Sequence, residues 1–193
     1  MFAEWGTPAT TPLVGSIRPD QIPHDHLRDL YEYWAARVVD GKPPPRSAID
    51  PVDLKVFLPN LLILEQVPAG TRHRYRYRLS GTAITRIVGR ELTGLSLQDA
   101  LPDPYLSYVV SIHDLVVDQQ RPVYSETLYH DQGNFVNGMT YRLALPLCAE
   151  PPRGPMVLVS QHWIRRSEKG AGQKGDWGID WRAAKPVTQI VTP

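Results

Sequence analysis

The sequence predicts an α+β domain, in which a five-stranded antiparallel sheet carries helices on one face and an N-terminal amphipathic helix precedes the sheet. Three observations support this fold class: an amphipathic helical pattern comes first, two strand patterns follow it, and helical segments separate these from three strand patterns joined by short turns. Strands joined by hairpins form antiparallel sheet, and helices inserted between strands pack on a face of that sheet. A chain of 193 residues is expected to form one compact domain.

The first helix is predicted over residues 24–39, where apolar residues recur at the i, i+3, i+4, i+7 spacing of one helix face. It is expected to end at Gly41, because three prolines follow that residue. A short helix is expected after Asp50 and Pro51, since Asp can cap a helix start and Pro suits its first position.

Five segments have strand patterns, and helical segments beginning at Gly81 and after Pro104 separate the second from the third. The alternation is clearest in the second strand, where arginines occupy one face and tyrosines the other. The predicted strands are 61–67, 72–79, 123–130, 139–148 and 156–164.

The two ends of the chain differ in composition from the predicted domain, residues 21–166. Residues 1–20 contain Pro, Thr and Gly without apolar periodicity, which predicts a flexible arm. Residues 167–193 are rich in Gly and Lys, which predicts a tail. Within this tail, Trp177 and Trp181 have strand-like spacing, and we expect them to dock within a homodimer.

Composition and motifs argue against several classes of protein. The formal net charge of +1 argues against a nucleic-acid binder, and the single cysteine, Cys148, excludes an internal disulfide framework. No run of about 20 apolar residues and no leader pattern is present, so we expect a cytoplasmic protein that does not bind membranes. The motifs GxSxG, HExxH, GxGxxG and the Walker loop are absent, so we do not expect an enzyme.

Several short sequence motifs occur in a specific order: Pro45-Arg46, Asp50–Leu54, Leu58-Pro59, Tyr75–Thr82 and Gly89–Gly94. Together they resemble a family of short bacterial PAS-like proteins, over residues 25–166. The resemblance implies a non-catalytic sensory or interaction module of bacterial signalling, with a pocket for a small ligand between sheet and helices. It also implies dimerisation through the outer sheet face or the N-terminal helix. An output domain would need about 100 further residues, so a separate output partner is expected.

Polar side chains within apolar segments mark the candidate pocket. Arg142 interrupts an apolar strand, and Gln161 and His162 lie near the end of the last strand. Polar groups on a pocket wall would orient a small polar ligand, although outward-facing positions on an alternating strand would also explain them. The candidate ligand-binding residues are Tyr77, Arg78, His113, Arg142 and His162.

His113 lies on the apolar side of the longest predicted helix, and three roles are open to it. The resemblance implies haem ligation as one alternative, and a buried histidine bonded to the backbone is another. If the chain were an enzyme, His113 or His162 would be the general base. Covalent flavin chemistry is not expected, because Cys148 ends a late strand instead of following the second one.

Two further patterns receive structural interpretations. His24 and His26 are interpreted as a helix start and not as a metal site, because side chains at i and i+2 do not share a helix face and no third ligand is nearby in sequence. Two interpretations are open for the arginine face of the second predicted strand. In the first, this face is solvated and Arg78 pairs with Glu65 or Glu126. The alternative RNA-binding face would consist of Arg72, Arg74, Arg76 and Arg78.

Overall fold

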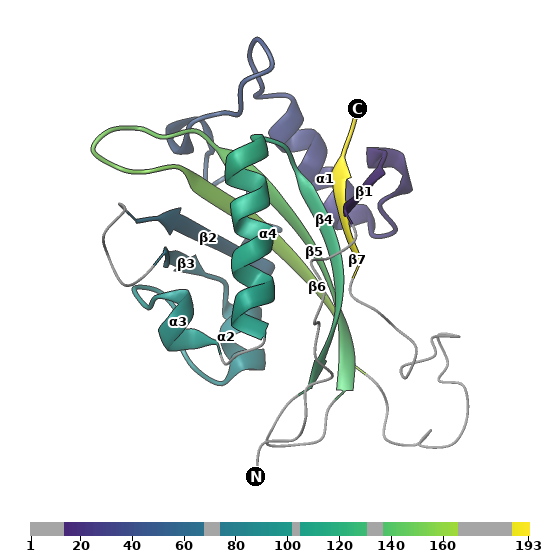
Figure 1. Cartoon of the computed structure of the whole chain (residues 1–193), viewed down its shortest axis with the longest axis vertical. Helices are drawn as coiled ribbons and strands as arrows, with labels where there is room; N and C mark the ends of the chain where they lie inside the picture. Colours follow the sequence, from purple (N-terminus) through teal and green to yellow (C-terminus); the bar gives the residue numbers. More distant parts are fainter. Residues whose placement is uncertain (1–13, 68–73, 102–104, 131–136, 166–186) are drawn as a thin grey trace.

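The computed structural model describes residues 14–67, 74–101, 105–130, 137–165 and 187–193, and these residues contain a seven-stranded sheet (Figure 1). The strand order is β1-β7-β4-β5-β6-β2-β3. Neighbouring strands are antiparallel except for β1 and β7, which are parallel. The strands are β1 Val14–Ile17, β2 Leu61–Gln66, β3 Tyr75–Ser80, β4 Val123–His130, β5 Asn137–Leu147, β6 Met156–Arg165 and β7 Val187–Val191.

The five predicted strands lie side by side as β3-β2-β6-β5-β4, and the sheet continues beyond them. β7 pairs with β4, and β1 pairs with β7. The predicted count of five strands is therefore corrected to seven. β1 lies within the predicted arm and β7 within the predicted tail, so parts of both ends belong to the sheet. Residues 1–13, Trp177 and Trp181 lie outside the described residues.

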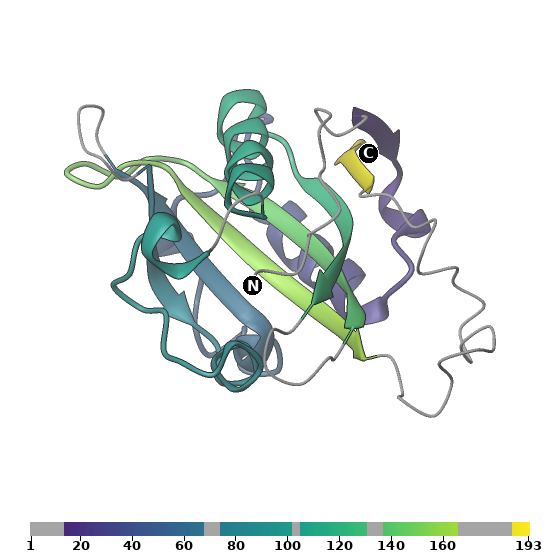
Figure 2. The same cartoon turned by 60° about the horizontal axis from the view of Figure 1, so that its bottom comes forward.

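Helices cover both faces of the sheet, whereas the sequence predicted helices on one face. Figures 1 and 2 show α4 on one side of the sheet and α1 on the other. α2 and α3 share the face of α4, because their buried residues belong to the same apolar cluster. The α-helices of the described residues are α1 Asp25–Ala35, α2 Thr82–Val88, α3 Leu97–Ala100 and α4 Tyr105–Gln119. None of the described helices is both long and apolar enough to cross a bilayer.

The amphipathic pattern of α1 explains its attachment to the sheet. Leu27 and Leu30 are completely buried against β5 and β6, and burial of each such side chain contributes about 2 kcal/mol. The indole of Trp34 donates a hydrogen bond of 2.8 Å to the carbonyl of Pro146. The helix ends at Ala35, four residues before the predicted end, and the chain then reverses at Asp40 and Gly41, which have positive φ angles.

The short helix expected after Asp50 is absent, and turns occupy residues 51–57 instead. The side chain of Asp50 accepts a hydrogen bond of 2.8 Å from the amide of Val52, which closes a turn two residues on. A 3-10 helix, Leu58–Asn60, follows and contains Pro59, which has no amide donor. A side chain at Gly81 would collide with the carbonyl oxygens of this 3-10 helix, so only glycine fits there.

Candidate functional site

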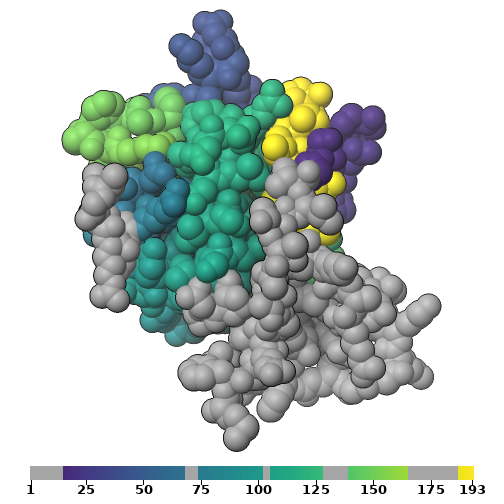
Figure 3. All heavy atoms as spheres, viewed as in Figure 1, coloured from purple at the N-terminus to yellow at the C-terminus, as the bar shows by residue number. Residues whose placement is uncertain are grey.

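A pocket lies between α4 and the sheet face that α4 covers, at strands β2, β3, β5 and β6. Its cavity has a volume of about 70 Å³. α4 and the neighbouring residues 74–101 form much of the molecular surface on this side (Figure 3). The lining is mainly apolar, with few polar side chains, as is typical of small-molecule sites. The lining residues are Leu62, Leu64, Tyr77, Ile84, Val88, Leu92, Leu101, Tyr105, Val109, His113, Arg142, Val159, Gln161 and Trp163.

Arg142 is the cation of this pocket, and its side chain is almost completely buried, with 1% exposure. Strand alternation places it on the α4 face, because its neighbours Tyr141 and Leu143 point toward α1. Its guanidinium donates a hydrogen bond of 2.7 Å to the hydroxyl of Tyr105, and longer bonds of 3.3 and 3.4 Å to Ser125 and Thr127. In the described part of the chain, no carboxylate forms an ion pair with it.

His113 reaches the same pocket from α4 and is 2% exposed. Its Nδ1 lies 2.7 Å from the carbonyl oxygen of Val109, and because a carbonyl only accepts, Nδ1 carries the proton. Its Nε2 is buried and has no hydrogen-bond partner among the described residues. Burial is the main cause that lowers the pKa of His113 to about 4. The bond to Val109 opposes the shift, and the charge of Arg142 contributes to it. At neutral pH, Nε2 is therefore an unoccupied acceptor.

Tyr77 also lines the pocket and is 3% exposed, and burial raises the pKa of its phenol. The pocket also contains polar atoms of Gln161, which the sequence offered as a polar group near the end of the last strand, and of Tyr105, which was not predicted. The side-chain oxygen of Gln161 is buried, and no described residue forms a hydrogen bond with it. The sequence signal for Gln161 is its spacing, since it shares the alternation of Val157 and Val159 on the same face of β6.

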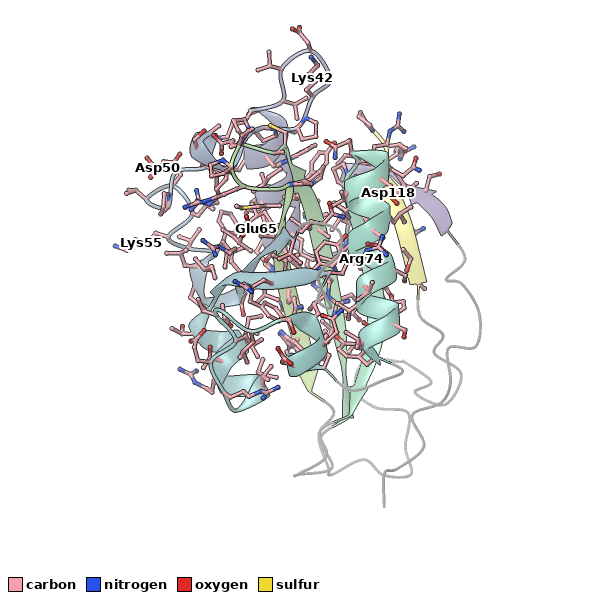
Figure 4. The ribbon with its side chains drawn as sticks, turned by 60° about the vertical axis from the view of Figure 1, so that its left-hand side comes forward. Lys42, Asp50, Lys55, Glu65, Arg74 and Asp118 are labelled. Atoms are coloured by element: carbon pink, nitrogen blue, oxygen red, sulfur yellow. The ribbon has the colours of Figure 1, made fainter. Side chains whose placement is uncertain are left out.

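Arg78 lies away from the pocket, at the surface of β3. Its Nε is 3.4 Å from a carboxylate oxygen of Glu65, which confirms one of the two pairings expected from the sequence. Arg74 is paired with Asp114 of α4 at 2.8 Å, and Figure 4 shows Arg74 lying against that helix. Arg76 is exposed, and Arg72 lies outside the described residues.

His162 lies on the opposite face of the sheet from the pocket, in an outer histidine cluster with His24 and His26. The ring centroids of His24 and His26 lie 4.2 and 4.9 Å from that of His162, and Tyr141 packs edge-on against His24 at 4.3 Å. Burial lowers the pKa of all three histidines, that of His24 to about 4. Repulsion from neighbouring histidines also contributes to the lowered pKa values of His24 and His26.

Sequence reasoning missed this cluster because it looked for a third histidine only near His24 and His26 along the chain. Pairing of β6 with β5, on which α1 packs, brings His162 to them. Among the described residues, no group of three or more His, Cys, Asp or Glu side chains could hold a metal ion.

The pocket does not fit haem or flavin. Its volume of about 70 Å³ is about half that of an engineered cavity of about 150 Å³ that holds benzene. A tetrapyrrole or an isoalloxazine ring is much larger than benzene. His113 lines a space that a small ligand could fill, and Cys148 is not among the lining residues.

Comparison with family models identifies a relationship for most of the chain. A family model described as PAS domain matches residues 22–158, which is more than two thirds of the 193-residue chain. The matched region includes α1, strands β2, β3, β4 and β5, β6 up to Leu158, and all residues of the pocket except Val159, Gln161 and Trp163. A comparison with curated proteins finds no match.

Proposed function

The chain belongs to the PAS domain family, and from this premise we propose that it is a non-catalytic sensory module that binds a small ligand beneath α4 and acts through a separate protein partner. Sensing and interaction are the general roles of PAS domains. The finer statements, that the pocket is the sensing site and that no reaction is catalysed, are supported by the chemistry of the pocket.

One observation carries this proposal: two buried polar groups converge on the pocket without the partners that buried groups normally have. Among the residues that the structure describes, Arg142 has only hydroxyl partners and His113 Nε2 has none. Most buried polar atoms in folded proteins are hydrogen-bonded, and buried charges are paired. A bound ligand would satisfy both groups.

The position of these two residues suggests how binding would become a signal. Arg142 belongs to β5 in the sheet, whereas His113 belongs to α4. A ligand that contacts both would tie α4 to the sheet, and it would shift the population toward the arrangement that binds it better. A partner protein that contacts α4 would then detect the ligand.

The two alternative functions are less well supported by the same geometry. A pKa of about 4 makes His113 a weak general base at neutral pH, which favours binding over proton transfer. In the RNA-binding alternative, the strand arginines would contact phosphates. Arg74 and Arg78 instead have carboxylate partners, Asp114 and Glu65.

Native mass spectrometry of the purified protein tests the proposal. We expect a small-molecule adduct that disappears on denaturation, together with the mass of a homodimer, and no absorption band of haem between 350 and 500 nm. Hydrogen exchange of α4 should slow when the released molecule is added back. Ligand-free protein from several growth conditions, with α4 exchange unchanged by any added extract, would contradict the ligand-binding role.

A further inference from the structure

We propose that the pocket beneath α4 binds a small hydroxy acid, with its carboxylate on Arg142 and its hydroxyl group donating to His113 Nε2. This inference rests on the ligand-binding function proposed above and specifies the chemical class of the ligand.

The charge of the ligand follows from the environment of Arg142. A guanidinium that is 1% exposed has lost nearly all its hydration, and such charges are normally compensated by an opposite charge. Its partners are the neutral hydroxyls of Tyr105, Ser125 and Thr127, and two of these bonds are longer than 3.2 Å. The planar donors of an arginine match the two oxygens of a carboxylate. An anion in the pocket would supply the missing charge.

The hydroxyl group follows from the tautomer of His113. Because Nδ1 donates to Val109, the unpartnered Nε2 of the neutral ring can only accept a hydrogen bond. The same ligand must therefore carry a donor as well as a negative charge. A hydroxyl group meets this requirement without adding a second charge.

The size of the ligand follows from the cavity. A volume of about 70 Å³ provides about five to seven water-sized positions, which matches an acid of about five or six non-hydrogen atoms. The remaining lining, including Leu62, Ile84 and Val159, is apolar and suits a short hydrocarbon body. Phosphate has a similar size but carries more charge than one arginine compensates, and it has no apolar part.

Isothermal titration calorimetry with paired probes tests the charge. The probes are acetate, glycolate and lactate, each compared with its own amide, together with inorganic phosphate. We expect at least one acid to bind about ten- to hundredfold more tightly than its amide, because a hydrogen bond to a charged group is worth more than a neutral one. Arg142→Met should abolish this difference. Arg76→Met, which removes an exposed arginine of β3, should keep it.

The hydroxyl is tested by the ratio of glycolate to acetate affinity. We expect glycolate to bind more tightly to the wild-type protein, and this preference should disappear in His113→Leu while acetate still binds. Equal binding of acids and amides, a stronger response to phosphate, or no binding by any of the probes to the wild-type protein would overturn the proposed ligand class.

The proposed function has a separate readout. If native mass spectrometry shows a bound molecule that is not an acid, the ligand class is wrong and the sensory function stands. If neither the probes nor any co-purifying molecule binds, both proposals fail. Because the acid and amide comparison uses the wild-type protein, it remains decisive even if Arg142→Met does not fold.

Discussion

The two faces of the sheet bury polar groups of different kinds. On the α4 face, Arg142 is a permanent cation with neutral hydroxyl partners. On the α1 face, the outer histidine cluster packs three rings against one another, and burial lowers their pKa values so that they are neutral at pH 7. The pocket therefore contains a guanidinium cation, whereas the outer histidine cluster acquires a positive charge only in acid.

This difference separates the proposed site from a structural cluster. A fixed buried charge is stabilised by an added anion, so the α4 face is suited to binding. The neutral rings of the α1 face stabilise the attachment of α1 through packing, and they require no ligand at pH 7. The residues of the two faces alternate along β5 and β6, so the same strands carry both environments.

The largest expected effect is a loss of stability on acidification from pH 7 to pH 5. The folded protein holds His113 and His24 at pKa values of about 4, whereas the unfolded chain binds these protons near pH 6.5. Protons then favour the unfolded state, so stability is complete above about pH 6.5 and falls as the pH drops toward 4. His113 alone contributes a loss of about 2 kcal/mol between pH 7 and pH 5.

Urea denaturation at pH 7, 6 and 5 measures this loss. His24 is partly exposed, so its contribution is discounted for solvent screening and should be smaller than that of His113. The carboxyl groups of Asp20, Glu91 and Glu150 have lowered pKa values and titrate below this range. A free energy of unfolding that stays constant from pH 7 to pH 5 would show that other interactions offset the cost of protonating the buried histidines.

Substitution of one ring should change the α1 face alone. His162→Phe keeps an aromatic ring against His24 but removes the repulsion that is the second cause of its low pKa. We expect the pKa of His24 to rise from about 4 toward 6.5, and the acid-induced loss of stability to decrease by about 1 kcal/mol. NMR titration of the imidazole rings measures this change.

His113 provides the internal control for this variant, because it lies on the other face. Its pKa should stay at about 4 in His162→Phe. An equal shift of both histidines would mean that the two faces are electrostatically coupled through the sheet, and the comparison between them would then fail.

Arg142→Met makes the reciprocal change on the α4 face. Removal of a buried cation without an ionic partner should increase the free energy of unfolding of the ligand-free protein by about 1 kcal/mol, since apolar replacement of buried charges is often neutral or stabilising. The pKa of His113 should rise, because Arg142 lowers it, while that of His24 stays the same. Thermal unfolding and imidazole titration measure both effects, and a marked destabilisation would show that the hydroxyl partners fully compensate the charge.

The sequence predicted much of this arrangement, because strand alternation is local. It placed Tyr141 and Leu143 on one face of β5, and Tyr75 and Tyr77 on the face of β3 opposite the arginines. It did not show that α1 covers the second face, since an amphipathic helix reveals its buried side but not the side of the sheet that receives it. β1 and β7 were missed for a related reason: they are short and pair across almost the whole chain.

Strand alternation also decides which of the predicted site residues the structure brings together. Tyr77, His113 and Arg142 meet at one pocket, although they come from three separate elements. Arg78 and His162 have the opposite alternation and face away from it. Residue type alone indicated polar groups within apolar segments. The sheet face on which each group lies decides which of them can contact the same ligand.

The smallest expected effect concerns Arg78, which faces away from the pocket. Weakening its ion pair tests whether residues on that face of β3 are independent of ligand binding. Its pairing with Glu65 is partly exposed, and surface ion pairs contribute about 0 to 1 kcal/mol. Glu65→Gln should therefore change the free energy of unfolding by at most about 1 kcal/mol, and less at high salt. Because neither Arg78 nor Glu65 lines the pocket, ligand affinity should remain at the wild-type value in calorimetry. A loss of ligand affinity in this variant, without a matching loss of stability, would mean that the outer face of β3 contributes to binding after all.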